Sequence, residues 1–223
     1  MPQTVPLTQG PYRSDVAIDW TPVPPRPGWR GGVDRFFGPG QTGREVAVQA
    51  IGLLVIGGVL TLLLLRDLPA ERFEWWRTLV LAIFAFDAIG GVLTNATGSA
   101  KRWYHRPGTR RERLFFIATH VAHLLLLGLV VLDLYWAWVA ANVVILLVAT
   151  LAIEFAPRSV QRPVAMGLTL LAVIGNQWLV PIPGMLAWIP VLLYLKLLVT
   201  HLVLEAPFAD APPPAADTDA RVP

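Results

Sequence analysis

The chain lacks cysteine altogether and contains few histidines and few lysines. None of its 223 residues is a cysteine, so it forms no disulfide and has no thiolate metal site. Its four histidines are too few for the clusters of histidine and carboxylate ligands that di-iron proteins need. Only two lysines, Lys101 and Lys196, stand against sixteen arginines. We predict no metal site, and the sequence favours a non-enzymatic role.

Charge is also scarce, and the apolar residues that replace it are grouped in long blocks. Charged residues make up 15% of the chain and hydrophobic residues 55%, whereas a soluble domain carries about 25% charged residues. A helix that crosses a bilayer needs about 20 mostly apolar residues. The blocks therefore predict an all-α, polytopic membrane helical bundle with six transmembrane helices. Two of the blocks are helical hairpins, with turns at Asp133-Leu134 and at Pro181–Gly184. The predicted spans are 46–65, 78–98, 114–132, 135–154, 164–181 and 186–204.

Basic residues are distributed unevenly between the two sides of the predicted bundle. With six spans both termini lie on one side, which holds fourteen basic residues against three (Arg66, Arg72 and Arg77) on the other. Positive charge near span ends marks the cytoplasmic side, so both termini are predicted to be cytoplasmic (N-in/C-in). Residues 1–45 are predicted to form an irregular cytoplasmic N-terminal arm without a cleavable signal peptide. Residues 46–205 form the six-helix transmembrane domain, and residues 206–223 a disordered cytoplasmic C-terminal tail.

Tryptophan supports this orientation, because indole rings favour the headgroup layers of a bilayer. Six tryptophans fall at the outer ends of the predicted spans. They are Trp75, Trp76, Trp136, Trp138, Trp178 and Trp188.

Ionisable side chains inside the predicted spans are the main functional candidates, because each costs at least about 2.5–3.5 kcal/mol at the bilayer centre. At ~1.5 Å per residue, Asp87, His123 and Lys196 lie ~13–16 Å from the outer ends of their spans, close to the midplane. We expect Asp87 and Lys196 to form an ion pair between the second and sixth spans, with His123 as a third member. His120 and His201 lie deeper, at ~21–22 Å.

The second span presents small residues beside this polar layer. Asp87, Gly91 and Asn95 recur at every fourth position, which places them on one face of a helix. Small residues at this spacing let helix backbones approach closely, so this face is expected to point into the bundle. Asn95 is therefore a further binding or relay candidate. Asn142 and Asn176 are expected to hydrogen-bond between helices.

Three functions remain open, beside a purely structural ion pair. The first is a small transporter or proton-coupled carrier, in which Asp87, His123 and Lys196 form a midplane site whose proton occupancy changes. A chain of this size predicts a homodimer. The second is a redox protein, either quinone-linked or with a b-haem held by His120 and His201, which lie at matching depth on different helices. The third is a non-catalytic accessory protein that contacts lipid.

The segment "SAKRWYHRPGTRRER", residues 99–113, carries the best signal for lipid contact. Lysine and arginine clusters next to a span bind anionic headgroups at about 1 kcal/mol per charge, although the same charges also set orientation. The predicted partners are thus the lipid bilayer and its anionic headgroups, with no nucleic acid. The headgroup candidates are Lys101, Arg102, Trp103, Tyr104 and Arg106.

Three segments, "RFFGPGQTGREV", "DAIGGVLTNATGSAKRWYHRPG" and "YLKLLVTHLVLEAPF", resemble parts of uncharacterised small bacterial six-span integral membrane proteins. The resemblance covers the chain from about Arg35 to Phe208. It implies the six-span fold and no known activity. The excess of arginine over lysine is typical of a GC-rich bacterium, and we predict a multi-pass protein of the bacterial cytoplasmic (inner) membrane.

Overall fold

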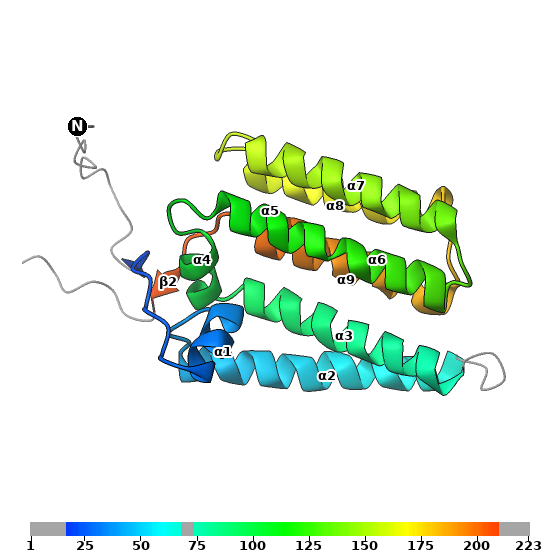
Figure 1. The fold of residues 1–223 in the computed structure, drawn as a ribbon, viewed down its shortest axis with the longest axis horizontal. Helices are drawn as coiled ribbons and strands as arrows, with labels where there is room; N and C mark the ends of the chain where they lie inside the picture. Colours follow the sequence, from blue (N-terminus) through cyan, green and yellow to red (C-terminus); the bar gives the residue numbers. More distant parts are fainter. Residues whose placement is uncertain (1–16, 68–73, 210–223) are drawn as a thin grey trace, which may run out of the picture.

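A computed structural model describes residues 17–67 and 74–209 (Figure 1). The described part is helical, apart from two short strands, β1 (Ala17–Ile18) and β2 (Phe208–Ala209), which pair antiparallel. The helical elements are, in chain order, α1 (Trp29–Phe37), α2 (Gly43–Asp67), α3 (Trp75–Asn95), α4 (Gly98–Tyr104), α5 (Arg110–Thr119), α6 (Val121–Leu126), η1 (Leu127–Val131), α7 (Trp136–Phe155), α8 (Gln161–Trp178), η2 (Gly184–Leu186), α9 (Trp188–Tyr194) and η3 (Leu195–His201).

The long helices form one bundle with α2 at its edge. In Figure 1, α2, α3, the α5–α6 rod and α7 run side by side, with α8 and α9 behind them. The α9–η3 rod lies inside the bundle, where it packs against α3 and α8. Helix α2 packs along α3, and most of its side chains are exposed. In a membrane those exposed apolar side chains meet acyl chains.

Five of these helical stretches are long and apolar enough to cross a membrane: Gly43–Arg66, Trp75–Asn95, Arg110–Val131, Trp136–Phe155 and Gly184–His201. They correspond to five of the predicted spans. The remaining predicted span, 164–181, coincides with α8, which is helical and packs against α7 and η3. Helix α8 begins with Gln161 and Arg162 and ends near Asn176 and Gln177, and these polar ends lower its hydropathy below that of the other five.

The predicted turn between α6–η1 and α7 is confirmed. Asp133 and Leu134 both have positive φ angles, 53° and 62°. A left-handed turn of this kind is accessible to aspartate more readily than to leucine. The Asp133 carboxylate lies 2.5 Å from the Arg77 guanidinium and so joins the turn to the start of α3.

Polar side chains join α7, α8 and α9 inside the bundle, as predicted for Asn142 and Asn176. Each of these amides donates to the other's carbonyl, at 3.0 and 2.8 Å, and the Tyr194 hydroxyl donates to Asn142 Oδ1 at 2.6 Å. A second buried contact, between Arg113 and Glu154 at 2.6 Å, fixes the start of α5 to the end of α7. Trp138, predicted to lie in the headgroup layer, is fully buried in this core instead.

The N-terminal arm is more regular than predicted. Residues Trp29–Phe37 form helix α1, which lies against α4. Gly38 follows it with a φ angle of 90°, and a Cβ there would overlap the backbone of Ala100. This close approach, which only glycine permits, holds α1 at the α4 end of the bundle. Of the predicted disordered tail, residues from 210 onward lie outside the described part of the chain.

Lys101 was predicted to face lipid headgroups, and this prediction is wrong. Its side chain is buried, and Nζ donates to the carbonyls of Thr200 at 2.6 Å and Val203 at 2.8 Å. The Glu205 carboxylate lies 3.6 Å away. Lys101 therefore closes the end of η3, where the last carbonyls of a helix lack partners. Burial lowers the pKa of Lys101 to about 8.

The lowered pKa predicts how stability depends on pH. Between pH 8 and the ordinary lysine value of 10.5, the unfolded chain holds a proton that the folded chain has released. Lys101 therefore makes the folded state more stable as pH rises through this window. The Tm of the wild type minus the Tm of Lys101→Met should therefore increase from pH 8 to pH 10. Tryptophan fluorescence in detergent measures both Tm values. A constant or falling difference would contradict the burial of a charge at this position.

Candidate functional site

The predicted ion pair between the second and sixth spans is present. Lys196, on η3, donates from Nζ to Asp87 Oδ2 on α3 at 2.6 Å. The Lys196 side chain is only 3% exposed and that of Asp87 is 30% exposed. A buried ammonium group needs an anionic partner, because an isolated charge is costly to remove from water. The pair therefore holds α3 and η3 in one relative position.

A glycine on α3 makes room for the lysine. A Cβ at Gly91 would overlap the Cε and Cδ atoms of Lys196. At the neighbouring Gly90, a Cβ would meet nothing within 4 Å. Gly91 thus lets the aliphatic part of the lysine side chain lie directly on the α3 backbone, on the face that the every-fourth-residue pattern predicted.

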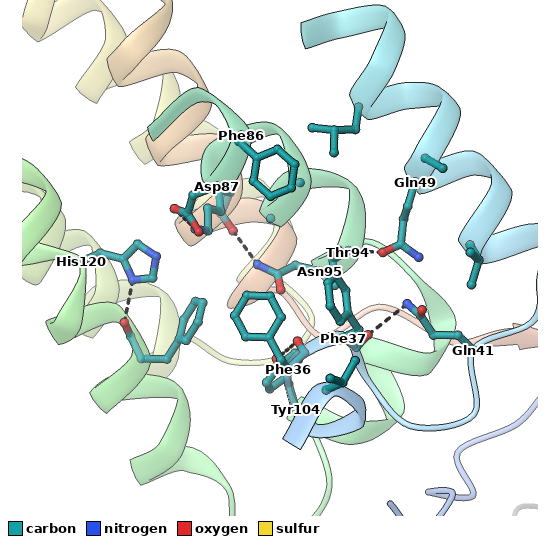
Figure 2. A pocket seen from close by; sticks show the side chains of 18 of the residues that line it. Phe36, Phe37, Gln41, Gln49, Phe86, Asp87, Thr94, Asn95, Tyr104 and His120 are labelled. Atoms are coloured by element: carbon teal, nitrogen blue, oxygen red, sulfur yellow. Dashed lines mark hydrogen bonds and ion pairs between the residues drawn. The ribbon is translucent and has the colours of Figure 1, made fainter. Parts of the chain in front are cut away.

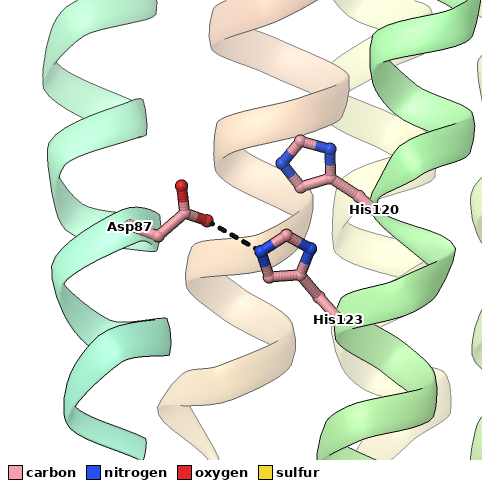
Figure 3. Close-up of side chains that lie close together, drawn as sticks. All are labelled: Asp87, His120 and His123. Atoms are coloured by element: carbon pink, nitrogen blue, oxygen red, sulfur yellow. Dashed lines mark ion pairs between the residues drawn. The ribbon is translucent and has the colours of Figure 1, made fainter. Parts of the chain in front are cut away.

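His123 completes a group that we call the Asp87 triad: Asp87, His123 and Lys196. Its Nε2 lies 3.3 Å from the same oxygen, Asp87 Oδ2, that accepts from Lys196 (Figure 3). Two nitrogen donors from different helices therefore converge on one carboxylate oxygen. His123 Nδ1 is buried and has no hydrogen-bond partner among the described residues.

The π-helical geometry of η3 positions Lys196 in this triad. A π-helical stretch is wider than an α-helix and is frequent at functional sites. The Lys196 carbonyl accepts from the Thr200 hydroxyl at 2.9 Å and lies 3.5 Å from Asn95 Nδ2. Asn95, a predicted binding or relay residue, is buried and contacts the backbone of Lys196. Asn95 therefore helps to position the backbone of Lys196.

His120 lies beside the triad rather than in it. Its ring stacks on that of His123 with centroids 4.7 Å apart, and its Nδ1 lies 2.8 Å from the Phe116 carbonyl oxygen (Figure 2). A proton on Nδ1 donated to that carbonyl leaves Nε2 as an acceptor in the neutral ring. His120 thus extends the polar group of the triad by one ring toward the α4 end.

The arrangement of His120 and His201 does not fit the predicted b-haem. The Phe116 ring lies against both imidazoles, tilted to that of His120 at 4.6 Å between centroids and stacked on that of His201 at 4.3 Å. A bis-histidine haem needs both imidazoles to reach one iron from opposite sides of a flat macrocycle. The phenyl ring fills the space that the macrocycle would need.

Three residues that could bind a metal ion, Asp87, His120 and His123, lie close together, a grouping not predicted above. One ligand atom from each of Asp87, His120 and His123 lies within 4.8 Å of the others. The spacing of the two histidines, three residues apart on one helix, was a signal for this grouping. However, the Lys196 ammonium already binds Asp87 as its cation. A divalent ion would have to displace it against charge repulsion, so the geometry favours proton chemistry over metal binding.

A groove of about 640 Å³ runs from the triad toward the α4 end of the bundle (Figure 2). Its floor is the α3 face from Phe86 to Asn95, one wall is α2, and the other is the α5–α6 rod. The walls are mostly apolar, with Val46, Ala50 and Leu53 on α2. The polar triad lies at the far end, where Phe84 is buried against Trp188 with ring centroids 5.8 Å apart.

Helix α1 covers the other end of this groove. Phe36 and Phe37 contribute to its lining, and the Tyr104 hydroxyl donates to the Phe36 carbonyl at 2.5 Å. Tyr104 therefore holds α1 in place rather than facing lipid headgroups. Gln49 on the α2 wall accepts from the Thr94 hydroxyl at 2.7 Å, which satisfies two of the polar groups in the lining.

The groove is open along the side of the bundle. Phe86 and Thr119 are exposed, and the side chains of Asp87 and His123 keep 30% and 32% exposure. This surface belongs to helices long and apolar enough to span a membrane, and in a membrane it would face acyl chains. An ionisable group exposed to hydrocarbon is unfavourable unless water or a polar ligand contacts it.

Of the other headgroup candidates, Trp103 and Arg106 form one unit at the surface. The Arg106 guanidinium lies 3.6 Å from the Trp103 ring centroid and 2.9 Å from Glu112. Arg102 is half-buried.

Comparison of the chain with protein-family models, curated proteins and solved structures finds no match.

The two neighbouring glycines on α3 give a matched pair of variants. Gly91→Ala forces Lys196 to move and should cost about 1–3 kcal/mol of folding free energy, as overpacking does. Gly90→Ala meets no atom and should be neutral or stabilise the helix by up to about 1 kcal/mol. Thermal unfolding in detergent measures both. Equal effects would mean that Lys196 does not lie on the α3 backbone.

A double-mutant cycle tests the ion pair itself. Asp87→Leu should cost about 3–5 kcal/mol, because it leaves the buried Lys196 ammonium without its anion. Lys196→Met should cost less, because Asp87 keeps its contact with His123 and is partly exposed. The double variant should cost less than the sum by at least about 1 kcal/mol, since the two changes remove one shared interaction. Denaturant unfolding in mixed micelles measures the three free energies. Strict additivity would show that the two groups do not interact.

Proposed function

We propose that this chain is a small proton-coupled carrier of the bacterial cytoplasmic membrane. The observation that carries the proposal is the Asp87 triad, a protonatable group at the blind end of a groove between membrane-length helices. Intramembrane charges of this kind mark substrate and proton pathways more often than other positions do.

We further propose that α8 is a sixth crossing and that both termini are cytoplasmic. The antiparallel pairing of Ala17–Ile18 with Phe208–Ala209 supports an even number of crossings, because it brings both ends of the described chain to one end of the bundle. The basic segment 99–113, which includes most of α4, lies at that same end, in keeping with positive charge on the cytoplasmic side.

The triad provides a means of coupling a proton to a substrate. With Asp87 ionised, its carboxylate neutralises Lys196 and accepts from His123. When Asp87 takes up a proton, both nitrogen donors lose their anionic acceptor and can bind a substrate instead. The ion pair joins α3 to η3, so its loss also removes a contact that holds these two elements together.

In this proposal the described state is the one whose groove lies in the cytoplasmic half of the bundle, with α1 covering its inner end. The groove extends from the triad to α1 and α4, whereas Phe84, Trp188 and buried Leu81 close the opposite half. In an alternating-access cycle these outer contacts separate while the inner half of the groove closes. If the protein is a carrier, the inner and outer parts of one face of α3 should be accessible to solvent in turn, one part in each state.

Cysteine labelling tests this reciprocity without background, since the chain has no native cysteine. Gly90→Cys reports on the inner groove, and Val80→Cys, seven residues before Asp87 on the same helix face, reports on the outer half. A membrane-impermeant methanethiosulfonate is applied to inside-out and right-side-out vesicles under opposite pH gradients. We expect Gly90→Cys labelling to fall and Val80→Cys labelling to rise when the gradient is reversed.

Two background substitutions separate the triad from general acid effects. Asp87→Asn should abolish the response of both reporters to the gradient, whereas Glu112→Gln, an exposed acid outside the groove, should leave it intact. If Val80→Cys stays unlabelled under both gradients, the protein does not alternate and the carrier proposal is wrong.

A further inference from the structure

We infer that the substrate of this site is an anionic amphiphile, a hydrocarbon chain with a phosphate monoester head that binds the Asp87 triad while the chain stays in the bilayer. This inference rests on the proposed carrier function and adds the chemical class of what is carried. Three features of the groove carry it: its lateral opening, its apolar walls and the convergence of two nitrogen donors at its blind end.

The lateral opening distinguishes a lipid-like substrate from a water-soluble one. Phe86 and Thr119 are exposed beside the partly exposed Asp87 and His123, all on membrane-length helices. A soluble solute would require a path enclosed by protein, because polar solutes do not share a surface with acyl chains. A lipid needs the opposite, a slot for its head with an open side through which its chain reaches the bilayer.

The walls suit a hydrocarbon chain. Val46, Ala50 and Leu53 line the α2 side, and Phe86 lies on the floor. The one polar wall residue of α2, Gln49, is already paired with Thr94. At about 640 Å³ the groove has the volume of sites that hold small organic ligands, roughly 300–1,000 Å³.

The charges at the blind end select the head. The titratable or charged groups that line the groove are Asp87 on α3, Tyr104 on α4, His120 and His123 on the α5–α6 rod, and Lys196 on η3; none comes from α2. With Asp87 protonated, the Lys196 ammonium has no anionic partner, and the His123 Nε2–H lies beside it as a second donor. A phosphate monoester carries about −1.5 to −2 at neutral pH and has strong acceptor oxygens, so one head can bind both groups. A cationic head would be repelled, and a neutral head would leave the ammonium unpaired.

The exchange balances in protons and breaks no covalent bond. One proton from the bulk binds the Asp87 carboxylate, and the Lys196 ammonium and His123 Nε2–H turn their hydrogen bonds to a phosphate oxygen. On release of the head, this proton returns to solvent and Asp87 Oδ2 accepts from both groups again. Exposed Arg30 and Arg35 on α1, at the mouth, attract anionic heads.

The chain's scarcity of lysine and histidine makes the test direct. The full chain, labelled with ¹⁵N only at its two lysines and four histidines, is placed in phosphatidylcholine nanodiscs and titrated with hexadecyl phosphate. Side-chain ¹⁵N resonances, assigned with single Lys→Arg and His→Gln variants, should shift saturably for Lys196 and His123. Lys101 and His105, which lie at the α4 end outside the groove, should not shift.

Matched ligands test the head and the chain separately. Hexadecanol, hexadecyltrimethylammonium and inorganic phosphate should each leave the Lys196 and His123 resonances unchanged. Equal binding of hexadecanol or of the cation would overturn the inference, and binding of inorganic phosphate alone would point to a soluble anion. Hexadecanoate should bind at least tenfold more weakly, and equal binding would overturn the phosphate assignment.

Matched variants test the triad. Lys196→Gln and His123→Gln should each weaken binding of hexadecyl phosphate at least tenfold; His123 is partly exposed, so its variant remains informative if Lys196→Gln does not fold. Arg106→Gln, which removes a positive charge outside the groove, should have no effect. Asp87→Asn should strengthen binding about tenfold at pH 7.5, because the carboxylate no longer competes with the head for Lys196 and His123. Shifts confined to Lys101 and His105 would place binding at the α4 end of the bundle, outside the groove, and overturn the inference.

These results are separable from those on the carrier itself. Reciprocal cysteine labelling without binding of hexadecyl phosphate would leave a carrier with another substrate. Binding at the triad without reciprocal labelling would leave a lipid-binding protein that does not alternate.

Discussion

The ion pair between Asp87 and Lys196 is the constraint on which the rest of this structure depends. An ammonium group that is 3% exposed inside a membrane bundle has to have its carboxylate within hydrogen-bond distance. That requirement fixes α3 against η3 and explains Gly91, which leaves space for the lysine side chain. Lys196 lies in the π-helical stretch η3, a kind of geometry that is frequent at functional sites.

The pair is not sealed off as a purely structural one would be. Asp87 keeps nearly a third of its side-chain surface, His123 shares its carboxylate oxygen, and both open onto the groove between α2 and the α5–α6 rod. A buried network that only held helices together would resemble the amide ladder of Asn142 and Asn176, which is closed on all sides. The contrast between these two polar groups within one bundle is the physical basis for assigning function to the first.

Near α4, residues of the same types as those in the triad have a structural role instead. Lys101 resembles Lys196 in the sequence, as one of the two lysines, but it binds the carbonyls that end η3 and serves the fold. Tyr104 and Gly38 likewise hold α1 across the groove. Through these contacts α1 covers the groove at one end, while the Phe84–Trp188 contact closes the other end.

Hydropathy and charge spacing determined the membrane-length helices, the Asp133 turn and the depth of Asp87, His123 and Lys196. Because an isolated charge at the bilayer centre is so costly, the pairing of the acid with the amine followed from the sequence alone. The burial of Lys101, the packing of Phe116 between two histidines and the groove itself did not follow. They depend on which faces of distant helices meet, and a linear pattern of apolar residues that is nearly uniform around α2 and α7 carries no such information. Only the tertiary structure decides which polar groups face lipid, protein or a shared cavity.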